Sequence, residues 1–170
     1  FVTYDSGNSD WRGLSGTASP DTVDGDASSP GWGLDLVLDS ADRPHLSYYN
    51  RTGGDGELRY AQWNGSAWLD ETIESTGPYL TNQTTGIALD SSEFANIAYS
   101  RSAGGATSAM FTRNDGVAWV GRTNATGPDI VDDTNDKGRF IDIVVTNLDF
   151  PRITYYDATF TNAMYAEWNE

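Results

Sequence analysis

The sequence predicts an all-β protein built from consecutive four-stranded antiparallel sheets. Three observations lead to this prediction: an internal repeat, short apolar segments of strand length, and turn signals between these segments. No segment keeps the 3.6-residue period of an amphipathic helix. With six Trp, nine Tyr and six Phe, the 170-residue chain is long and apolar enough to bury a core.

The repeat is clearest in one seven-residue segment that occurs three times. It reads PHLSYYN from residue 44, ANIAYSR from residue 95 and PRITYYD from residue 151, so the offsets are 51 and 56 residues. An apolar segment precedes each copy, over residues 34–40, 87–91 and 141–147. A further strand-like segment follows each copy, from residues 58, 109 and 163. Each repeat therefore predicts at least three strands in a fixed order.

Turn residues predict a fourth strand. Asn64-Gly65 and Asp115-Gly116 are strong two-residue hairpin signals, because both turn positions favour positive φ. The fourth strands then begin at Trp68 and Trp119. Near the start, residues 19–21 resemble the Gly-Pro loops that follow these fourth strands. With the strands of one unit named A to D, the chain reads CD, ABCD, ABCD, ABC.

Four short strands in each unit of about 40 to 50 residues are typical of β-propeller blades, in which strand A lines a central channel. The expected units are a partial blade over 1–30, blades over 31–82 and 83–137, and an incomplete blade over 138–170. So few blades favour completion by another chain, as a six-bladed dimer that exchanges strands or as a head-to-tail polymer. A stack of sheets, a β-sandwich and a piece of a longer propeller are the alternatives.

Charge and composition limit the partners. The chain carries 25 acidic and 10 basic residues, and Lys137 is the single lysine. We expect no nucleic-acid partner, because phosphate binding needs clustered cations. We expect no membrane insertion, because no apolar run approaches the roughly 20 residues of a membrane-spanning helix. The absence of cysteine excludes disulfides and thiolate metal sites.

Four Asn-x-Ser/Thr sequons mark Asn50, Asn64, Asn82 and Asn124 as glycosylation candidates, and we expect all four in turns. Together with the acidity, the sequons favour a protein that is secreted or held at the cell surface.

The motifs Leu-Asp-Ser, Pro-His-Leu-Ser-Tyr-Tyr-Asn, Leu-Arg-Tyr-Ala and Asn-Gly-Ser-Ala-Trp all lie within residues 38–68. They resemble the repeats of secreted bacterial and archaeal β-propellers related to the BNR and sialidase-like (Asp-box) group. The turn over residues 114–119 is similar to a degenerate Asp-box but lacks its leading Ser-x-Asp. The resemblance implies the propeller fold. It implies no catalytic residue, because no motif marks the arginines, tyrosine and glutamate of a sialidase site.

Two pairs of residues are candidates for binding. Asp35 and Asp142 interrupt equivalent A strands, where carboxylates facing a propeller channel could hold calcium; the simpler explanation is that they cap backbone groups or contact water. The acidic loops over residues 24–26 and 132–136 carry calcium-type oxygen ligands without EF-hand spacing, so solvated loops are the simpler explanation there too. No cofactor is required. Trp32 and Tyr79 lie in less regular segments and are the candidates for stacking on a sugar ring.

Other chemistry-bearing residues favour structural roles. His45 is the single histidine, so no Ser-His-Asp or His-rich metal site is available. Ten aromatic residues recur with the repeat and are expected to pack between blades: Tyr48, Tyr49, Tyr60, Trp63, Tyr99, Phe111, Tyr155, Tyr156, Tyr165 and Trp168.

We therefore expect a non-enzymatic extracellular module, structural or adhesive, that acts in an oligomer or surface assembly. A lectin-like propeller with a glycan ligand is the alternative, and a glycoside hydrolase-like propeller is the third hypothesis.

Overall fold

The computed structural model describes the chain except residues 1, 2, 6, 8, 9, 18, 28, 29, 53, 79–82, 169 and 170. The described residues form fourteen β-strands and no helix, and hence no helix that could cross a membrane. The prediction of an all-β protein is confirmed.

The strands form one hairpin and three sheets. The N-terminal hairpin consists of β1 (Thr3–Asp5) and β2 (Asp10–Arg12). The first sheet has the order β3 (Pro30–Leu38), β4 (Pro44–Thr52), β5 (Asp55–Trp63) and β6 (Trp68–Pro78). The second sheet contains β7 (Thr85–Leu89), β8 (Ala95–Ala103), β9 (Ala106–Asn114) and β10 (Trp119–Val120), and β11 (Asp129–Asp132) also pairs with β9. The third sheet contains β12 (Arg139–Val145), β13 (Pro151–Asp157) and β14 (Asn162–Glu167).

All neighbouring strands in these sheets are antiparallel. The predicted strand order CD, ABCD, ABCD, ABC is therefore confirmed.

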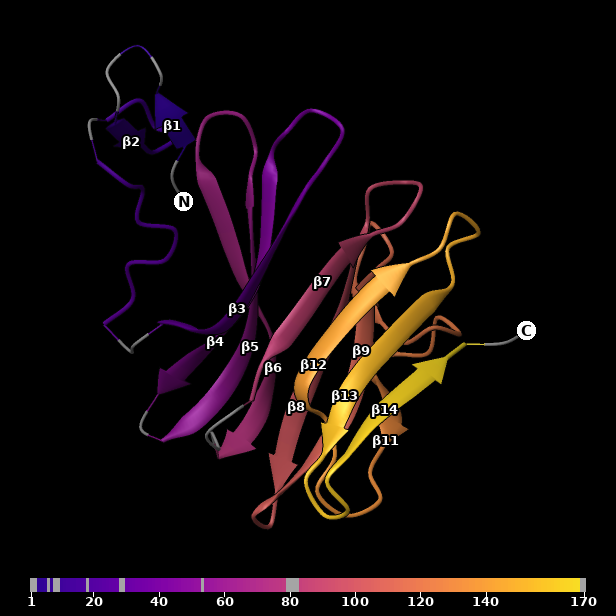
Figure 1. Ribbon diagram of the computed structural model, residues 1–170. Helices are drawn as coiled ribbons and strands as arrows, with labels where there is room; N and C mark the ends of the chain where they lie inside the picture. The colour runs from indigo at the N-terminus through magenta and orange to yellow at the C-terminus, as the bar shows by residue number, and fades with distance from the viewer. Residues whose placement is uncertain are drawn as a thin grey trace.

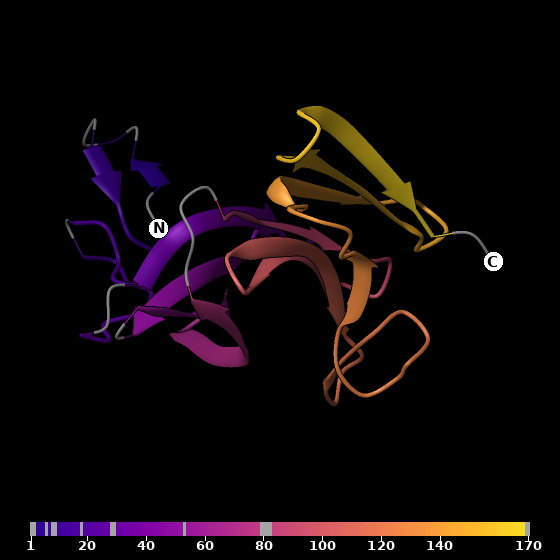
Figure 2. The ribbon, with the colours of Figure 1, turned by 90° about the horizontal axis from the view of Figure 1, so that it is seen from below.

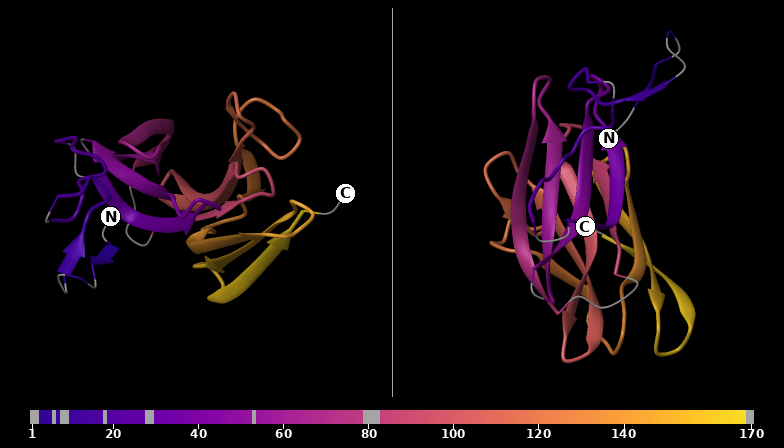
Figure 3. Two further views of the ribbon diagram at one scale, coloured as in Figure 1. Left: turned by 90° about the horizontal axis from the view of Figure 1, so that it is seen from above. Right: turned by 90° about the vertical axis from the view of Figure 1, so that its left-hand side faces the viewer.

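The sheets follow one another along a curve. Their first strands, β3, β7 and β12, lie side by side in the middle of the molecule (Figure 1). Seen from below and from above, the sheets fan out around an arc, with the N-terminal hairpin at one end and the third sheet at the other (Figures 2 and 3). This arrangement is consistent with consecutive propeller blades; the closed ring stays a prediction.

The turn between the first two strands is built in the same way in all three sheets. Its first residue accepts two backbone N–H groups through its side chain; this residue is Asp39, Asp90 or Thr146. Its fourth residue has a positive φ of 57° to 64° and is Asp42, Glu93 or Asp149. A left-handed conformation at a residue other than glycine costs about 1–2 kcal/mol, so its recurrence indicates that the carboxylate at this position has a role.

The core lies between the sheets rather than inside any one of them. One cluster joins the first and second sheets around Tyr49, Leu58, Ile97 and Tyr99. A second cluster joins the second and third sheets around Phe111, Ile143, Ile153 and Tyr155. Most of the recurring aromatics are buried, as expected from packing between blades, but Tyr165 and Trp168 are exposed.

Buried cationic side chains tie neighbouring parts of the array together through ion pairs. Arg59 of β5 is buried and pairs with Asp26 at 2.7 Å and with Asp70, which ties the N-terminal segment to the first sheet. Lys137, only 5% exposed, pairs with the buried Asp157 between the second and third sheets.

Candidate functional site

The predicted aromatic platform is only partly described. Trp32 lies on β3 with its ring exposed, and the guanidinium carbon of Arg51 lies 5.2 Å from the ring centroid. Tyr79 lies outside the described residues. The pairing of these two residues stays a prediction.

The two A-strand carboxylates occupy different environments. The Ile87 N–H donates to Asp35 Oδ2 at 2.9 Å, so Asp35 links β3 to β7, as the backbone-capping explanation expects. Asp142 is exposed on β12, and its Oδ1 accepts a bond from the N–H of Ile143 at 2.8 Å. Within the described ranges there is no group of three or more His, Cys, Asp or Glu side chains that could hold a metal ion. Calcium binding stays a prediction.

The acidic loops accept hydrogen bonds from buried tyrosines. Tyr48 donates to Asp24 Oδ2 at 2.8 Å, and Tyr155 donates to Asp132 Oδ2 at 2.9 Å. Burial raises the pKa of both hydroxyls, so they remain protonated donors. Burial also raises the pKa of Asp132, but hydrogen bonds from Thr134 and Tyr155 outweigh that effect and the net pKa is lowered. The solvated-loop explanation is thus incomplete, because these carboxylates tie loops to the sheets.

The sequons differ in exposure. Asn50 is buried in β4 at 1% exposure, so the expectation that it lies in a turn is wrong; a sequon carries no information about burial. Asn64 and Asn124 are exposed in turns. Asn82 lies outside the described residues.

A pocket between the second and third sheets has polar and aromatic residues together. Its volume is about 200 Å³. Phe111, Val131, Ile153 and Ala166 form its apolar wall. Its other lining residues include two carboxylates, an arginine and a tryptophan: Asp129, Glu167, Arg122 and Trp168. We call this the inter-sheet pocket.

Arg122 and Asp129 come from the loop that joins β10 to β11. Asp129 Oδ2 accepts the N–H of Arg122 at 2.6 Å, which closes the loop. Gly121 allows this closure, because a Cβ there would overlap the Asp129 carboxylate. The guanidinium carbon of Arg122 lies 5.4 Å from the centroid of Phe150, and its buried Nε–H has no hydrogen-bond partner among the described residues. A buried donor without a partner is costly, and this atom is an exception to the usual pairing of buried polar groups.

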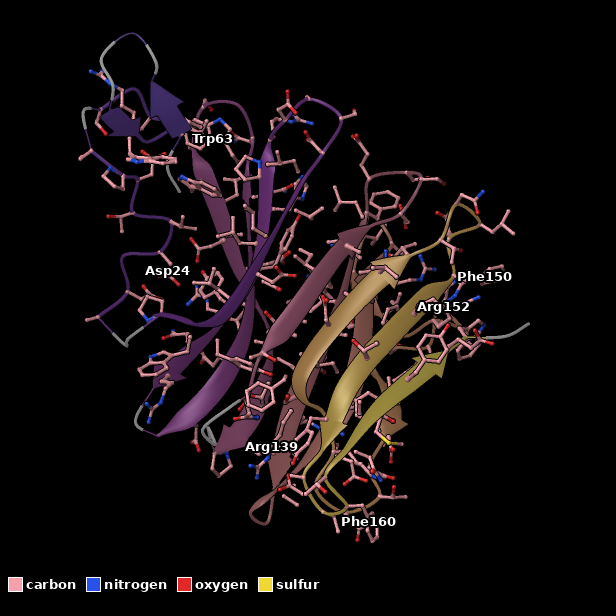
Figure 4. The ribbon with its side chains drawn as sticks, in the orientation of Figure 1. Asp24, Trp63, Arg139, Phe150, Arg152 and Phe160 are labelled. Carbon is pink, nitrogen blue, oxygen red and sulfur yellow. The ribbon has the colours of Figure 1, made fainter. Side chains whose placement is uncertain are left out.

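Glu167 is the last residue of β14, and Trp168 follows it. Arg152 of the neighbouring strand β13 is labelled in Figure 4. Arg152 is the register partner of Glu167, and its Nε lies 3.1 Å from Glu167 Oε2. Tyr165 donates to the same oxygen at 2.9 Å. Partial desolvation of the exposed ring, followed by this bond, raises the pKa of Tyr165. Arg152 also donates to the backbone carbonyl of Trp168 at 3.2 Å. Trp168 is thus positioned by its neighbours while 37% of its surface remains exposed.

Arg152, Glu167 and Trp168 form what we call the corner of the third sheet. The equivalent positions in the other sheets explain why the sequence does not single it out. The paired positions are His45 and Gln62 in the first sheet, Asn96 and Arg113 in the second, and Arg152 and Glu167 in the third. Only the third pair joins opposite charges. That departure from the repeat is the sequence signal that could have indicated a site here. Trp168 gives no such signal, because a recurring aromatic residue is expected to pack in the core.

No protein-family model matches the chain, and no curated protein matches it. Among solved structures, the chain is similar to a fucose lectin from Kordia zhangzhouensis, whose structure is a complex with methyl-fucoside. The TM-score is 0.47 and the identity 15%, over 80% of this chain and 92% of that chain. A similarity of this size carries no argument about function, so the proposals below depend on the geometry of the chain itself.

Proposed function

We propose that the protein is a lectin-like, carbohydrate-binding module that takes a sugar residue into the inter-sheet pocket. The observation that carries this proposal is that the exposed residue Trp168 lines the same pocket as the arginine Arg122 and the carboxylate-bearing Glu167.

The chemistry of the lining suits a sugar. Hydroxyl groups both donate and accept, so a carboxylate and a guanidinium in one pocket can bind neighbouring hydroxyls of one ring. An aromatic ring can pack on the apolar C–H face of a sugar. The pocket volume of 200 Å³ is below the roughly 300–1,000 Å³ of sites for drug-sized ligands, which favours a single ring.

A glycan array followed by titration calorimetry with the best monosaccharide tests this function. Trp168→Ala and Arg122→Met are each expected to weaken binding at least tenfold. Trp32→Ala, which removes an exposed aromatic residue outside the pocket, is the matched control and should leave the affinity unchanged. If Trp32→Ala abolishes binding and Trp168→Ala does not, the site is the platform on β3. If no glycan binds, the proposed function is wrong.

We propose that this binding is non-catalytic. Two carboxylates line the pocket, but Asp129 is engaged in closing its own loop. A panel of chromogenic glycosides should therefore show no turnover. Turnover that is lost in Glu167→Gln would instead support the hydrolase hypothesis.

A structural or adhesive module is the second candidate, because an apolar row is exposed at one end of the array. Leu34, Leu36 and Leu38 of β3 are 58%, 43% and 45% exposed. Rows of this kind mark interaction surfaces. Both functions are proposed for a protein outside the cell, as expected from the acidity and the sequons.

A further inference from the structure

We propose that the exposed face of the third sheet docks on the exposed face of the first sheet in a second copy of this chain. The contact is head-to-tail and repeats the junction that the chain already forms twice, between its first and second sheets and between its second and third. The two faces at the ends of the array are the unused halves of this junction.

Strand β7, the first strand of the second sheet, shows the burial expected of a strand that has a neighbouring sheet on each side. The second sheet has a neighbour on each side, and the side chains of β7 are buried or half-buried throughout. The strands equivalent to β7 at the two ends each expose one alternating row. On β3 the row is Leu34, Leu36 and Leu38; on β12 it includes Phe140 at 57% and Val144 at 59%. Both rows therefore lie on faces that a neighbouring sheet would cover.

The first polar feature of the junction is the positive-φ turn residue. The Ser40 N–H donates to Glu93 Oε1 of the next sheet at 2.7 Å, and the Ser91 N–H donates to Asp149 Oδ1 at 2.7 Å. Asp42 is the equivalent carboxylate in the first sheet, where it is exposed and has no side-chain bond to any described residue. Asn147 stands in the place of Ser40 and Ser91 in the third sheet and is also exposed. In the docked pair, the Asn147 N–H of one copy donates to Asp42 of the next.

The second polar feature lies on the A strands. Asp35 accepts the N–H of Ile87 from the following sheet. In the next junction Gly86 takes the place of Asp35 and lies so close to the third sheet that a Cβ would be 2.8 Å from the Cα of Asp142. Asp142 repeats the position of Asp35 on the exposed face, and Leu36 repeats the position of Ile87. The same direction of donation therefore pairs the Leu36 N–H of one copy with Asp142 of the other.

The third polar feature is already present inside the chain. Tyr99 donates to Glu74 and Tyr155 donates to Asp132, each across one junction. Tyr48 finds its carboxylate in Asp24 of the N-terminal segment. Docking thus has to supply only the turn feature, the A-strand feature and the apolar rows. A second copy is the occupant that fits, because both complementary halves belong to one chain and continue an existing interface.

Light scattering on the whole chain tests the docking, with one charge placed on each face. Wild type should show at least twice the chain mass of 18.5 kDa at micromolar concentration. Leu36→Arg on the first face and Val144→Arg on the second should each give monomers with wild-type circular dichroism. Val117→Arg, in an exposed turn away from both faces, is the control and should assemble like wild type.

Mixing the two monomeric variants gives the sharper result. Each variant retains one intact face, so an equal mixture should form a two-chain particle and stop there, because the remaining faces are both blocked. A wild-type monomer, or assembly that survives either charge, would overturn the docking. A mixture that stays monomeric would overturn the head-to-tail geometry. Glycan binding by the monomeric variants is measured separately, so failure of the docking and failure of the proposed function are distinguishable.

Discussion

The first and third sheets contain the same corner in two different forms. In the first sheet His45 is buried, its Nδ1 lies 2.5 Å from the Tyr60 hydroxyl, and Trp63 is only 9% exposed. Trp68 covers Trp63 with ring centroids 5.7 Å apart. In the third sheet the corresponding residues are the ion pair of Arg152 with Glu167 and the exposed Trp168.

The difference shows how a repeated position changes its role. A fourth strand covers the corner of the first sheet, so uncharged residues that pack well are favoured there. In the third sheet Trp168 and the side chain of Glu167 are 37% and 39% exposed, so this corner tolerates charge. The strand register places the side chains, and a covering strand decides whether they are buried or exposed.

The largest expected effect is a difference in stability loss between alanine variants of the two tryptophans, Trp63 and Trp168. Trp63→Ala is expected to cost about 3–5 kcal/mol of unfolding free energy, because it leaves a cavity under Trp68. Trp168→Ala is expected to cost about 1–2 kcal/mol, because the ring is already partly exposed. Urea unfolding followed by circular dichroism measures both values. Equal losses would show that the two corners are packed alike.

Moving the charged pair to the first sheet should be the next largest effect. The double substitution His45→Arg with Gln62→Glu is expected to lose on the order of 2–4 kcal/mol, because both charges would be desolvated under the fourth strand. The reverse exchange, Arg152→His with Glu167→Gln, should lose less than about 1 kcal/mol. Thermal unfolding of the two double variants makes the comparison, and a stable charged pair in the first sheet would contradict it.

The two corners should also differ in their response to pH. Burial lowers the pKa of His45 below its ordinary 6.5, although Asp39 opposes the shift. As the pH falls, His45 therefore takes up its proton at a higher pH in the unfolded chain than in the folded chain. The free energy of unfolding is highest above pH 6.5 and decreases as the pH falls toward the pKa of the folded state. The slope cannot exceed about 1.4 kcal/mol per pH unit for one group.

Melting temperatures of wild type between pH 8 and pH 5 give this slope, with His45→Gln as the reference. The variant should lose the part of the slope that belongs to the single histidine, and the equivalent position in the third sheet is not a histidine. Identical slopes in wild type and variant would show that His45 titrates normally.

The smallest effect concerns the ion pair itself. A double-mutant cycle of Arg152→Met and Glu167→Gln should give a coupling energy of about 0.3–1 kcal/mol, because both side chains are partly exposed. The coupling should decrease in 1 M NaCl through screening. A coupling that is unchanged by salt would indicate a pair more deeply buried than the side-chain exposures of 24% for Arg152 and 39% for Glu167.

The order of the strands could be predicted because the repeat and its Asn-Gly and Asp-Gly turns are local signals. The strands beside β9 at the edge of the second sheet could not be predicted in this way. A fourth strand was expected from Trp119, but β10 contains two residues and β11 completes the pairing with β9 after a loop closed by Asp129. That closure depends on a contact between Gly121 and a carboxylate eight residues away, which has no periodic signature.

The candidate site was harder to predict than the fold. The inter-sheet pocket joins Arg122 to Glu167 and Trp168, which lie more than 40 residues apart in the chain and in different sheets. The sequence predicts packing for Trp168 because aromatic residues recur with the repeat. Exposure depends on whether a neighbouring strand covers the ring, and the recurrence of an aromatic residue cannot show this.

The burial of Lys137 protects the only lysine side chain of the folded chain from amine-reactive reagents. Its ammonium group is paired with Asp157 and lies 5.7 Å from the ring centroid of Phe160, so dyes and crosslinkers reach it when this part of the array opens. Acylation located on Lys137 by peptide mass spectrometry, measured against time, therefore counts openings at the contact between the second and third sheets. The rate of this acylation thus measures local unfolding beside the inter-sheet pocket.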